Sequence, residues 1–438
     1  MTAVLILLLF IILFVAYYSM TRSFVSPFSL LLVSFIMALS IIVSNTDNWQ
    51  VSINSRFILY ILIAAGSFGL GCIIANSLFG PQILGAGDQC VIPDQALNDS
   101  RLPNLVLVLC SLLCTAVYVF LSIRIGGSNG NTSVFRSIYE ASAENSSNFV
   151  LHQFREIVVA LAEISLIIVF KRKYIDKKRL PLPMLIPSIC FFVSAMFSTD
   201  RNIFIRFIIF ALCLWILFYS STSLRKVSIT NRKIFRNTIV IVVVAALLFF
   251  MLGKIKSYTS NLERMIGIYG GSGLYNFNLC VDKIDCAELQ YGQYTFSQLL
   301  KLLDRILDVF GIAVNEPANS TGIQMVVFLA PNGYVYASNI YSAMTPYMID
   351  FGVLGLLIFP ATMGFIFKCL YSVAVKRGSF FLWGLYAMMV YSVVYFTIGE
   401  QFFMRFHLGM VYEIFWYSII YFLVFGNRTA RVRFSILS

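Results

Sequence analysis

The segment Tyr334-Val-Tyr336-Ala-Ser-Asn339-Ile-Tyr341 closes the interval that decides how the chain is organised, residues 254–347. This is the one long interval after the start of the chain that has no apolar run able to cross a bilayer, which takes about 20 helical residues. It carries Arg264 and Arg305 together with tyrosine, asparagine and serine side chains. We therefore expect it to bind something polar at a membrane surface, with the rest of the chain as its scaffold.

The composition is that of a membrane protein. Hydrophobic residues make up 59% of the chain and charged residues 12%, and the mean hydropathy of +0.84 is far above that of a soluble globular protein. We predict an all-α polytopic membrane protein with about eleven transmembrane helices. The first is expected to be a retained span, because it lacks the basic n-region and the cleavage site of a signal peptide. The apolar runs cover residues 3–20, 27–44, 57–79, 102–123, 149–170, 182–198, 202–220, 236–253, 347–373, 379–397 and 406–425.

Lysine and arginine set the expected orientation, because they are retained on the cytoplasmic side of a membrane. Four basic clusters alternate with the predicted spans, at 171–179, 225–236, 376–377 and 428–433. Placing all four inside puts the N-terminus outside and makes the long interval one large outward loop. The net charge of +12 follows from this bias, so we expect membrane lipids and not nucleic acid as the partner of the basic residues.

This topology divides the chain into three parts. Residues 1–253 are expected to form transmembrane helices 1–8, residues 254–346 the large outward loop, and residues 347–438 helices 9–11 with a basic cytoplasmic tail.

Ionisable residues inside the predicted spans are candidates for function, because charge is expensive in a bilayer and faces a bundle interior or a wet cavity. Span five opens with Arg155 and Glu156, and Glu163 lies two turns deeper. The first two also fit a plain ion pair at the level of the lipid head groups, whereas Glu163 does not. Arg201 at the start of span seven can snorkel to the interface. Arg206 lies about 7 Å deeper at 1.5 Å per residue, so we expect it to be functional.

A second polar group precedes the last span, in Glu400-Gln-Phe-Phe-Met-Arg405-Phe-His407. Glu413 follows inside the span itself. His407 is one of only two histidines in the chain, and the topology places it at the outer surface. Both a structural and a catalytic role for His407 stay open at this point.

The large loop contains one clear helical pattern and two cysteines. Thr295-Phe-Ser-Gln298 has the form of a capping box, and apolar residues then recur at helical spacing. We predict an amphipathic helix over 295–310 that lies on the membrane face or over the helix bundle. Among its charges, Arg305 is the one expected to do more than face solvent. We also expect a disulfide between Cys280 and Cys286, because the topology puts them in an oxidising compartment.

No strong enzyme motif is present. The chain has no His-Glu-x-x-His, no Cys-x-x-Cys, no glycine-rich nucleotide loop and no Gly-x-Ser-x-Gly, and two histidines at separate helix ends make a poor metal site. We therefore expect no metal and no cofactor. The outer face is instead rich in arginine, which binds phosphate through its bidentate fork, beside aromatic, asparagine and serine residues that suit a sugar. These arginines are Arg136, Arg155, Arg201, Arg206, Arg264, Arg305 and Arg405.

The layout of the whole chain carries a resemblance to a known family. The chain has about eleven spans, one dominant outward loop in its C-terminal half, a Ser198-Thr-Asp-Arg201 turn, and Tyr341 through Asp350-Phe-Gly352-Val-Leu-Gly355 leading into the next span. In these features it resembles the O-antigen polymerase (Wzy) family of bacterial surface-polysaccharide synthesis. The resemblance implies a GT-C-like membrane fold in the bacterial inner membrane, with the large loop and the active site facing the periplasm.

The same resemblance implies a metal-independent glycosyltransferase. Such an enzyme moves the growing glycan from undecaprenyl pyrophosphate onto an incoming lipid-linked repeat unit, and a chain-length regulator is its implied protein partner. We expect Arg201, Arg206 and Arg405 to stabilise the pyrophosphate leaving group. His407 is the expected base for the acceptor hydroxyl, with Glu400 as the second candidate. The other expected substrate-binding residues are Arg136, Arg264, Arg305, Asn339 and Tyr341.

Two other functions fit many of these features. A lipid-linked oligosaccharide flippase also has many spans and buried charges, but transporters of that kind usually show internal repeats, and none is visible here. An O-antigen ligase shares the layout and the donor chemistry and uses the lipid A core as its acceptor.

Overall fold

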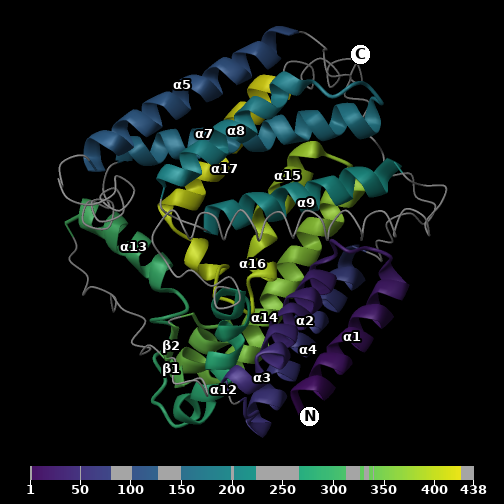
Figure 1. The fold of residues 1–438 in the computed structure, drawn as a ribbon, viewed down its shortest axis with the longest axis vertical. Helices are drawn as coiled ribbons and strands as arrows, with labels where there is room; N and C mark the ends of the chain where they lie inside the picture. The colour runs from purple at the N-terminus through teal and green to yellow at the C-terminus, as the bar shows by residue number, and fades with distance from the viewer. Residues whose placement is uncertain are drawn as a thin grey trace. The chain divides into compact units, whose positions relative to one another are not determined.

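The computed structural model describes residues 2–49, 51–79, 101–126, 149–198, 202–222, 266–311, 326–329, 335–338 and 340–425. These residues are helical apart from one short β-hairpin and the connecting turns (Figure 1). They belong to two compact units, each assembled from separate stretches of chain. The first unit contains Met1–Ala86, Thr259–Lys376 and Met389–Leu408, and the second contains Gly87–Tyr258, Arg377–Met388 and Gly409–Ser438.

The first unit holds the N-terminal helices and the described part of the large loop. The hairpin pairs β1 (Val326–Leu329) with β2 (Val335–Ser338) antiparallel, Val326 opposite Ser338. Two short helical turns, Gly267–Gly271 and Phe403–Arg405, also belong to it. Its helices are α1 (Thr2–Thr21), α2 (Pro27–Ser44), α3 (Thr46–Trp49), α4 (Ser55–Phe79), α12 (Ser272–Asp285), α13 (Ser297–Val309), all but the last residue of α14 (Met344–Arg377), and α16 (Tyr391–Val394).

Close helix packing holds the first unit together. α2 contacts α1, α4, α12 and α16, and α1, α2 and α4 run side by side in Figure 1. α4 crosses α14 at two glycines. A Cβ on Gly71 would lie 1.9 Å from the carbonyl oxygen of Ala361, and one on Gly364 would lie 2.1 Å from that of Phe68. Only glycine allows this approach, which is the small-residue packing typical of membrane helices.

The second unit is built around α7 (Phe149–Phe170). This helix contacts α5, α8 and α9, and nearly all of its residues from Glu156 to Val169 are buried. A helix that is apolar and buried all round belongs at the centre of a bundle. Two turns, Lys171–Ile175 and Leu182–Leu185, follow it. The other helices of the unit are α5 (Arg101–Gly126), α8 (Ile186–Phe197), α9 (Asn202–Thr222), α15 (Phe380–Met389) up to Met388, and α17 (Leu408–Phe425) from Gly409 onward.

Seven of the described helices are long and apolar enough to cross a membrane, which supports the predicted α-helical polytopic membrane protein. They are α1, α2, α4, α5, α9, α14 and α17, and each coincides with a predicted span. Among the other predicted spans, 149–170 forms α7 as one helix of 22 residues. Residues 182–198 give the shorter α8, and residues 379–397 break between α15 and α16. The span 236–253 lies outside the described residues, so the total of eleven stays a prediction.

The amphipathic helix of the large loop is present as α13 and is followed by Gly311 at a φ of 74°. Its predicted capping box is wrong, because the N-cap residue is Phe296 and makes no side-chain cap. The backbone N–H groups of Tyr294 and Thr295 donate instead to the carboxylate of Asp350 on α14. A carboxylate 55 residues away in sequence therefore holds the turn that precedes α13, whereas the predicted local cap is not formed.

The predicted disulfide between Cys280 and Cys286 is also wrong, since both cysteines are free thiols. Cys280 lies inside α12 and Cys286 is its C-cap residue. Six residues along a helix rise about 9 Å at 1.5 Å each, whereas a disulfide needs Cα atoms about 4.4–6.8 Å apart. The helix itself keeps the two sulfur atoms apart.

Candidate functional site

The second unit buries three glutamates on transmembrane-length helices. Glu156 and Glu163 are seven residues apart on α7, so they share one face of the helix two turns apart. They are 4% and 3% exposed. Arg155 donates from Nη2 to Oε1 of Glu156 at 2.6 Å. This is the ion pair that the sequence analysis gives as one alternative for these two residues. Glu163 lies deeper among apolar neighbours, where a charged group needs a specific reason.

Arg206 of α9 forms an ion pair with Glu413, the third glutamate, on α17. The Glu413 side chain is 2% exposed and that of Arg206 is 24% exposed. Arg206 also interacts electrostatically with Glu156 and Glu163. Burying a charge costs several kcal/mol unless a partner compensates it, so this pairing is what allows both side chains to lie within apolar helices.

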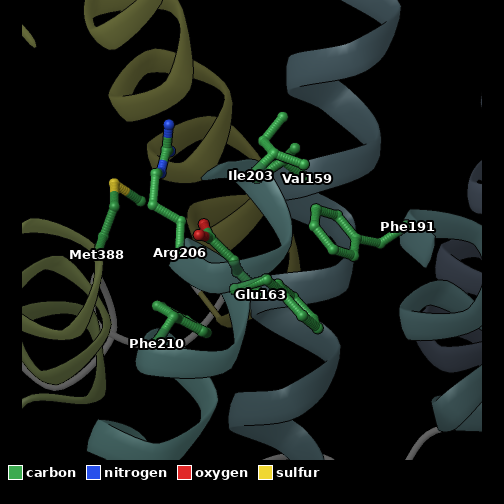
Figure 2. A pocket seen from close by; sticks show the side chains of 8 residues that line it. Val159, Glu163, Phe191, Ile203, Arg206, Phe210 and Met388 are labelled. Atoms are coloured by element: carbon green, nitrogen blue, oxygen red, sulfur yellow. The ribbon is translucent and has the colours of Figure 1, made fainter. Parts of the chain in front are cut away.

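Glu163 and Arg206 both line a small cavity. Figure 2 shows the Glu163 carboxylate turned toward the stem of Arg206, with Val159, Ile203 and Met388 around them. The cavity has a volume of about 10 Å³, which is room for about one water molecule. Neither a sugar nor a pyrophosphate fits, so a phosphate group can reach Arg206 only from outside this cavity.

The first unit holds a second polar cluster, centred on Glu400. Its Oε1 accepts hydrogen bonds from the backbone N–H groups of Phe402 and Phe403, both at 2.9 Å, and from the Tyr347 hydroxyl at 3.0 Å. Its Oε2 accepts from the N–H of Met404 at 2.8 Å. Burial raises the pKa of the Glu400 carboxyl, and the three backbone bonds counteract that rise. These contacts shape the turn Phe403–Arg405 around the carboxylate.

Aromatic rings pack around this turn. Phe403 makes edge contacts with Phe296 just before α13 and with Phe359 on α14, at centroid distances of 5.0 and 5.3 Å. The Tyr347 ring lies 6.2 Å from that of Phe403. The segment that follows Glu400 thus packs against the start of α13 and against α14. Packing as well as hydrogen bonding therefore sets its conformation.

Arg405 and His407 leave this turn in different environments. Arg405 is buried at 4% exposure, whereas His407 is exposed. The backbone N–H of His407 donates to the carbonyl oxygen of Arg405 at 2.7 Å. The turn therefore leaves the His407 side chain exposed while the Arg405 side chain is buried.

Tyr341 is the other predicted site residue whose side chain is described. It is buried, at 9% exposure, and burial raises the pKa of its hydroxyl to about 12. It lies at the end of the large loop, immediately before α14, in the same unit as Glu400 and His407.

The structure thus groups Glu400, Arg405, His407 and Tyr341 in one unit and places Arg206 in the other. Arg305 lies on α13, but its side chain is outside the described part. The remaining predicted residues also lie outside the described residues: Arg136, Arg201, Arg264 and Asn339.

The structure adds two residues that no expected role covered. Glu413 is the partner of Arg206, and Asp350 accepts from the backbone of the turn before α13. Glu413 had a detectable signal, since it is a lone carboxylate inside a predicted span. Asp350 lies in the segment that carries the family resemblance, but its role depends on a partner distant in sequence. Among the described residues, no group of three or more His, Cys, Asp or Glu side chains is arranged to hold a metal ion.

Comparison with known proteins adds nothing to this description. No protein-family model matches the chain, and no curated protein and no solved structure is similar to it.

Proposed function

We propose that the protein is a metal-independent membrane glycosyltransferase that polymerises a lipid-linked surface glycan. The observation that carries the proposal is Arg206. It is an arginine inside a transmembrane-length helix, held by Glu413 and bordering a cavity with Glu163. Charged groups kept inside apolar helices at this cost mark a functional site, and arginine is the side chain best suited to a pyrophosphate.

In the proposed reaction, the hydroxyl of the incoming repeat unit attacks the anomeric carbon of the growing glycan. The bond between that carbon and the pyrophosphate oxygen breaks, and undecaprenyl pyrophosphate leaves with the bonding electrons. Arg206 stabilises the charge that develops on the leaving group. Glu413 orients its guanidinium as a positioning residue.

His407 is exposed but belongs to the other unit from Arg206, so its role as the base for the attacking hydroxyl stays a prediction from the sequence. Glu400 is less suited to that role, since hydrogen-bond donors already occupy both of its carboxylate oxygens. We assign it to the shape of the turn that presents Arg405 and His407.

The lipopolysaccharide banding pattern of a strain that lacks the gene tests the proposal. Loss of a polymerase leaves core capped with a single repeat unit. Bare core with polymer on its carrier lipid would identify a ligase instead, and the absence of any outward repeat unit would identify a flippase. Either of these two patterns would overturn the proposal.

Arg206→Lys in the complemented strain tests the role of the arginine. Lysine keeps the charge opposite Glu413 but loses the bidentate fork, so the protein should accumulate normally while long chains become scarce. Loss of a preorganised donor typically costs about 100- to 1,000-fold in rate. Arg179→Ala, a change at an exposed arginine in the predicted cytoplasmic cluster, is the matched control and should give full ladders. Full ladders from Arg206→Lys would contradict the mechanism.

A further inference from the structure

The first unit contains a groove that the proposed reaction does not use. It lies between the start of α4, the end of α12 and α14, with a volume of about 490 Å³. Sites for small molecules typically measure about 300–1,000 Å³. Arg56, Tyr60 and Asp285 line it with polar groups, and Leu59, Leu289 and Val353 with apolar ones.

The polar wall is a fixed arrangement of donors and acceptors. The Tyr60 hydroxyl shares its one proton between the two oxygens of Asp285, at 3.0 Å from Oδ1 and 2.9 Å from Oδ2, and Nη1 of Arg56 donates to Oδ2 at 3.1 Å. Since each carboxylate oxygen can accept two hydrogen bonds, Oδ1 keeps room for a further donor. Asp285 is held firmly, since its side chain is 15% exposed. The contacts of the Arg56 guanidinium within the described residues all run through Nη1. Of its five N–H groups, those on Nε and Nη2 therefore stay available to a ligand.

The charge of this wall argues against an anionic ligand. The two charged groups that line the groove, Arg56 and Asp285, lie 3.1 Å apart, so their charges cancel when both are ionised. A phosphate therefore gains no net attraction. A hydroxyl group, by contrast, both donates and accepts, and it matches a carboxylate and a guanidinium that lie side by side.

The apolar wall completes the match. Leu59 is 54% exposed, Leu289 42% and Val353 39%, so the groove also has an exposed hydrophobic lining. α14 is kinked at this point by Gly352, whose φ of 59° and ψ of −147° are not helical. A sugar ring has hydroxyl groups at its edge and apolar C–H groups on its face, so one ring can satisfy both walls.

We propose that this groove binds a sugar ring of the glycan substrate, with Asp285 and Arg56 bonding its hydroxyl groups. The inference rests on the proposed function for the identity of the glycan. The predicted topology places both the segment before α4 and the large loop that contains α12 outside the membrane, where a lipid-linked glycan is presented.

The test is binding of the host strain's repeat-unit oligosaccharide, released from its carrier lipid by mild acid, to the full-length protein in detergent. Saturation-transfer NMR reports contact, and a titration gives the affinity. Asp285→Asn should weaken binding about tenfold or more, since a hydrogen bond to a charged group is worth at least that factor. The carrier-linked repeat unit, used in parallel, should bind with the same dependence on Asp285.

Asp282→Asn is the matched control. It removes the same charge three residues earlier, from a side chain that is 66% exposed and does not line the groove. It should keep full affinity. Leu289→Trp fills the groove without touching the ion pair, and it should abolish binding even if Asp285→Asn fails to fold.

Full affinity in Leu289→Trp would overturn the groove proposal, and so would equal losses in Asp282→Asn and Asp285→Asn. Binding of phosphatidylethanolamine vesicles in place of the oligosaccharide would assign the groove to a lipid amine instead and would equally overturn it.

The binding experiment tests the groove and the banding pattern tests the polymerase, so either proposal can be rejected without the other. Oligosaccharide binding that depends on Asp285, in a protein whose deletion leaves long chains intact, would support the groove and reject the polymerase. A single-repeat pattern with binding unaffected by Leu289→Trp would support the polymerase and reject the groove.

Discussion

The two polar clusters bury their carboxylates in different ways. In the first unit, the Glu400 carboxylate is satisfied by three backbone N–H groups and one phenol. In the second unit, Glu413 relies on the charge of Arg206, and Glu163 borders a cavity with the same arginine. Backbone donors cannot move away without unfolding the turn, whereas a guanidinium can exchange one anionic partner for another.

This difference underlies the roles that we propose for the two groups of carboxylates. Glu400 has the chemical type of a general base but the contacts of a structural residue. The ion pair between Arg206 and Glu413 adds little to the stability of the fold, because a buried ion pair is often no more stable than an apolar pair of the same size. Their retention inside apolar helices is therefore better explained by chemistry than by stability.

The largest expected effect tests this explanation directly. Arg206→Leu should lower the free energy of unfolding by about 3–5 kcal/mol, because it leaves Glu413 buried without compensation. The double variant Arg206→Leu with Glu413→Leu should recover most of that stability and still give the single-repeat pattern. Thermal unfolding in detergent and the banding pattern measure the two quantities. A double variant as unstable as the single one would show that the pair does not act as a unit.

Substitutions of Glu400 should lower stability strongly and activity per folded molecule only slightly. Glu400→Ala leaves buried N–H groups without acceptors and should cost about 3 kcal/mol or more, at about 1–3 kcal/mol for each unsatisfied group. Activity per folded molecule should fall only as far as the turn is distorted. Thermal unfolding with Gln401→Ala as the control on the same segment provides the measurement. If the Glu400→Gln variant is stable but inactive, Glu400 is the base and not a structural residue.

Asp350 extends the comparison to a second carboxylate that accepts from backbone groups. Asp350→Ala leaves the N–H groups of Tyr294 and Thr295 without this acceptor and should cost about 1–3 kcal/mol, detected as faster amide exchange in the turn just before α13. Thr295→Val is the matched control, because the Thr295 hydroxyl makes no hydrogen bond within the described residues. If Thr295→Val has the larger effect, the local capping box holds after all.

The smallest effect is expected at the two cysteines. Replacing Cys280 and Cys286 with serine should change the free energy of unfolding by less than about 0.5 kcal/mol, as for surface changes away from special features. A membrane-impermeant maleimide should label the exposed Cys286 in intact spheroplasts without prior reduction. Cys280 should react more slowly, because burial raises the pKa of its thiol. Labelling only after reduction would restore the disulfide, and no labelling would contradict the outward orientation.

Local patterns predicted most of the secondary structure. Seven predicted spans and the helix at 295–310 appear within a few residues of their expected bounds, because apolar length and periodicity are properties of neighbouring residues. The same reasoning singled out Arg206, since a lone charge in an apolar run is visible without a fold.

The predictions that are wrong concern contacts that local sequence patterns do not show. Asp350 holds the turn before α13, and Oε1 of Glu400 accepts from a tyrosine 53 residues away. The compartment alone predicts a bond between the two cysteines, whereas the helix on which they lie keeps the thiols apart.

The sequence by itself determined that this protein is a bundle of apolar helices with charged residues at defined depths, because hydropathy and residue type are local. Only the tertiary structure decided which charge each of them meets. It paired Arg206 with Glu413 across 207 residues of chain, enclosed Glu400 in backbone donors, and brought Asp285 to Arg56 across 229 residues. The physical reason is that the energy of a buried charge depends on the groups within a few ångströms of it, and chain folding alone selects those groups.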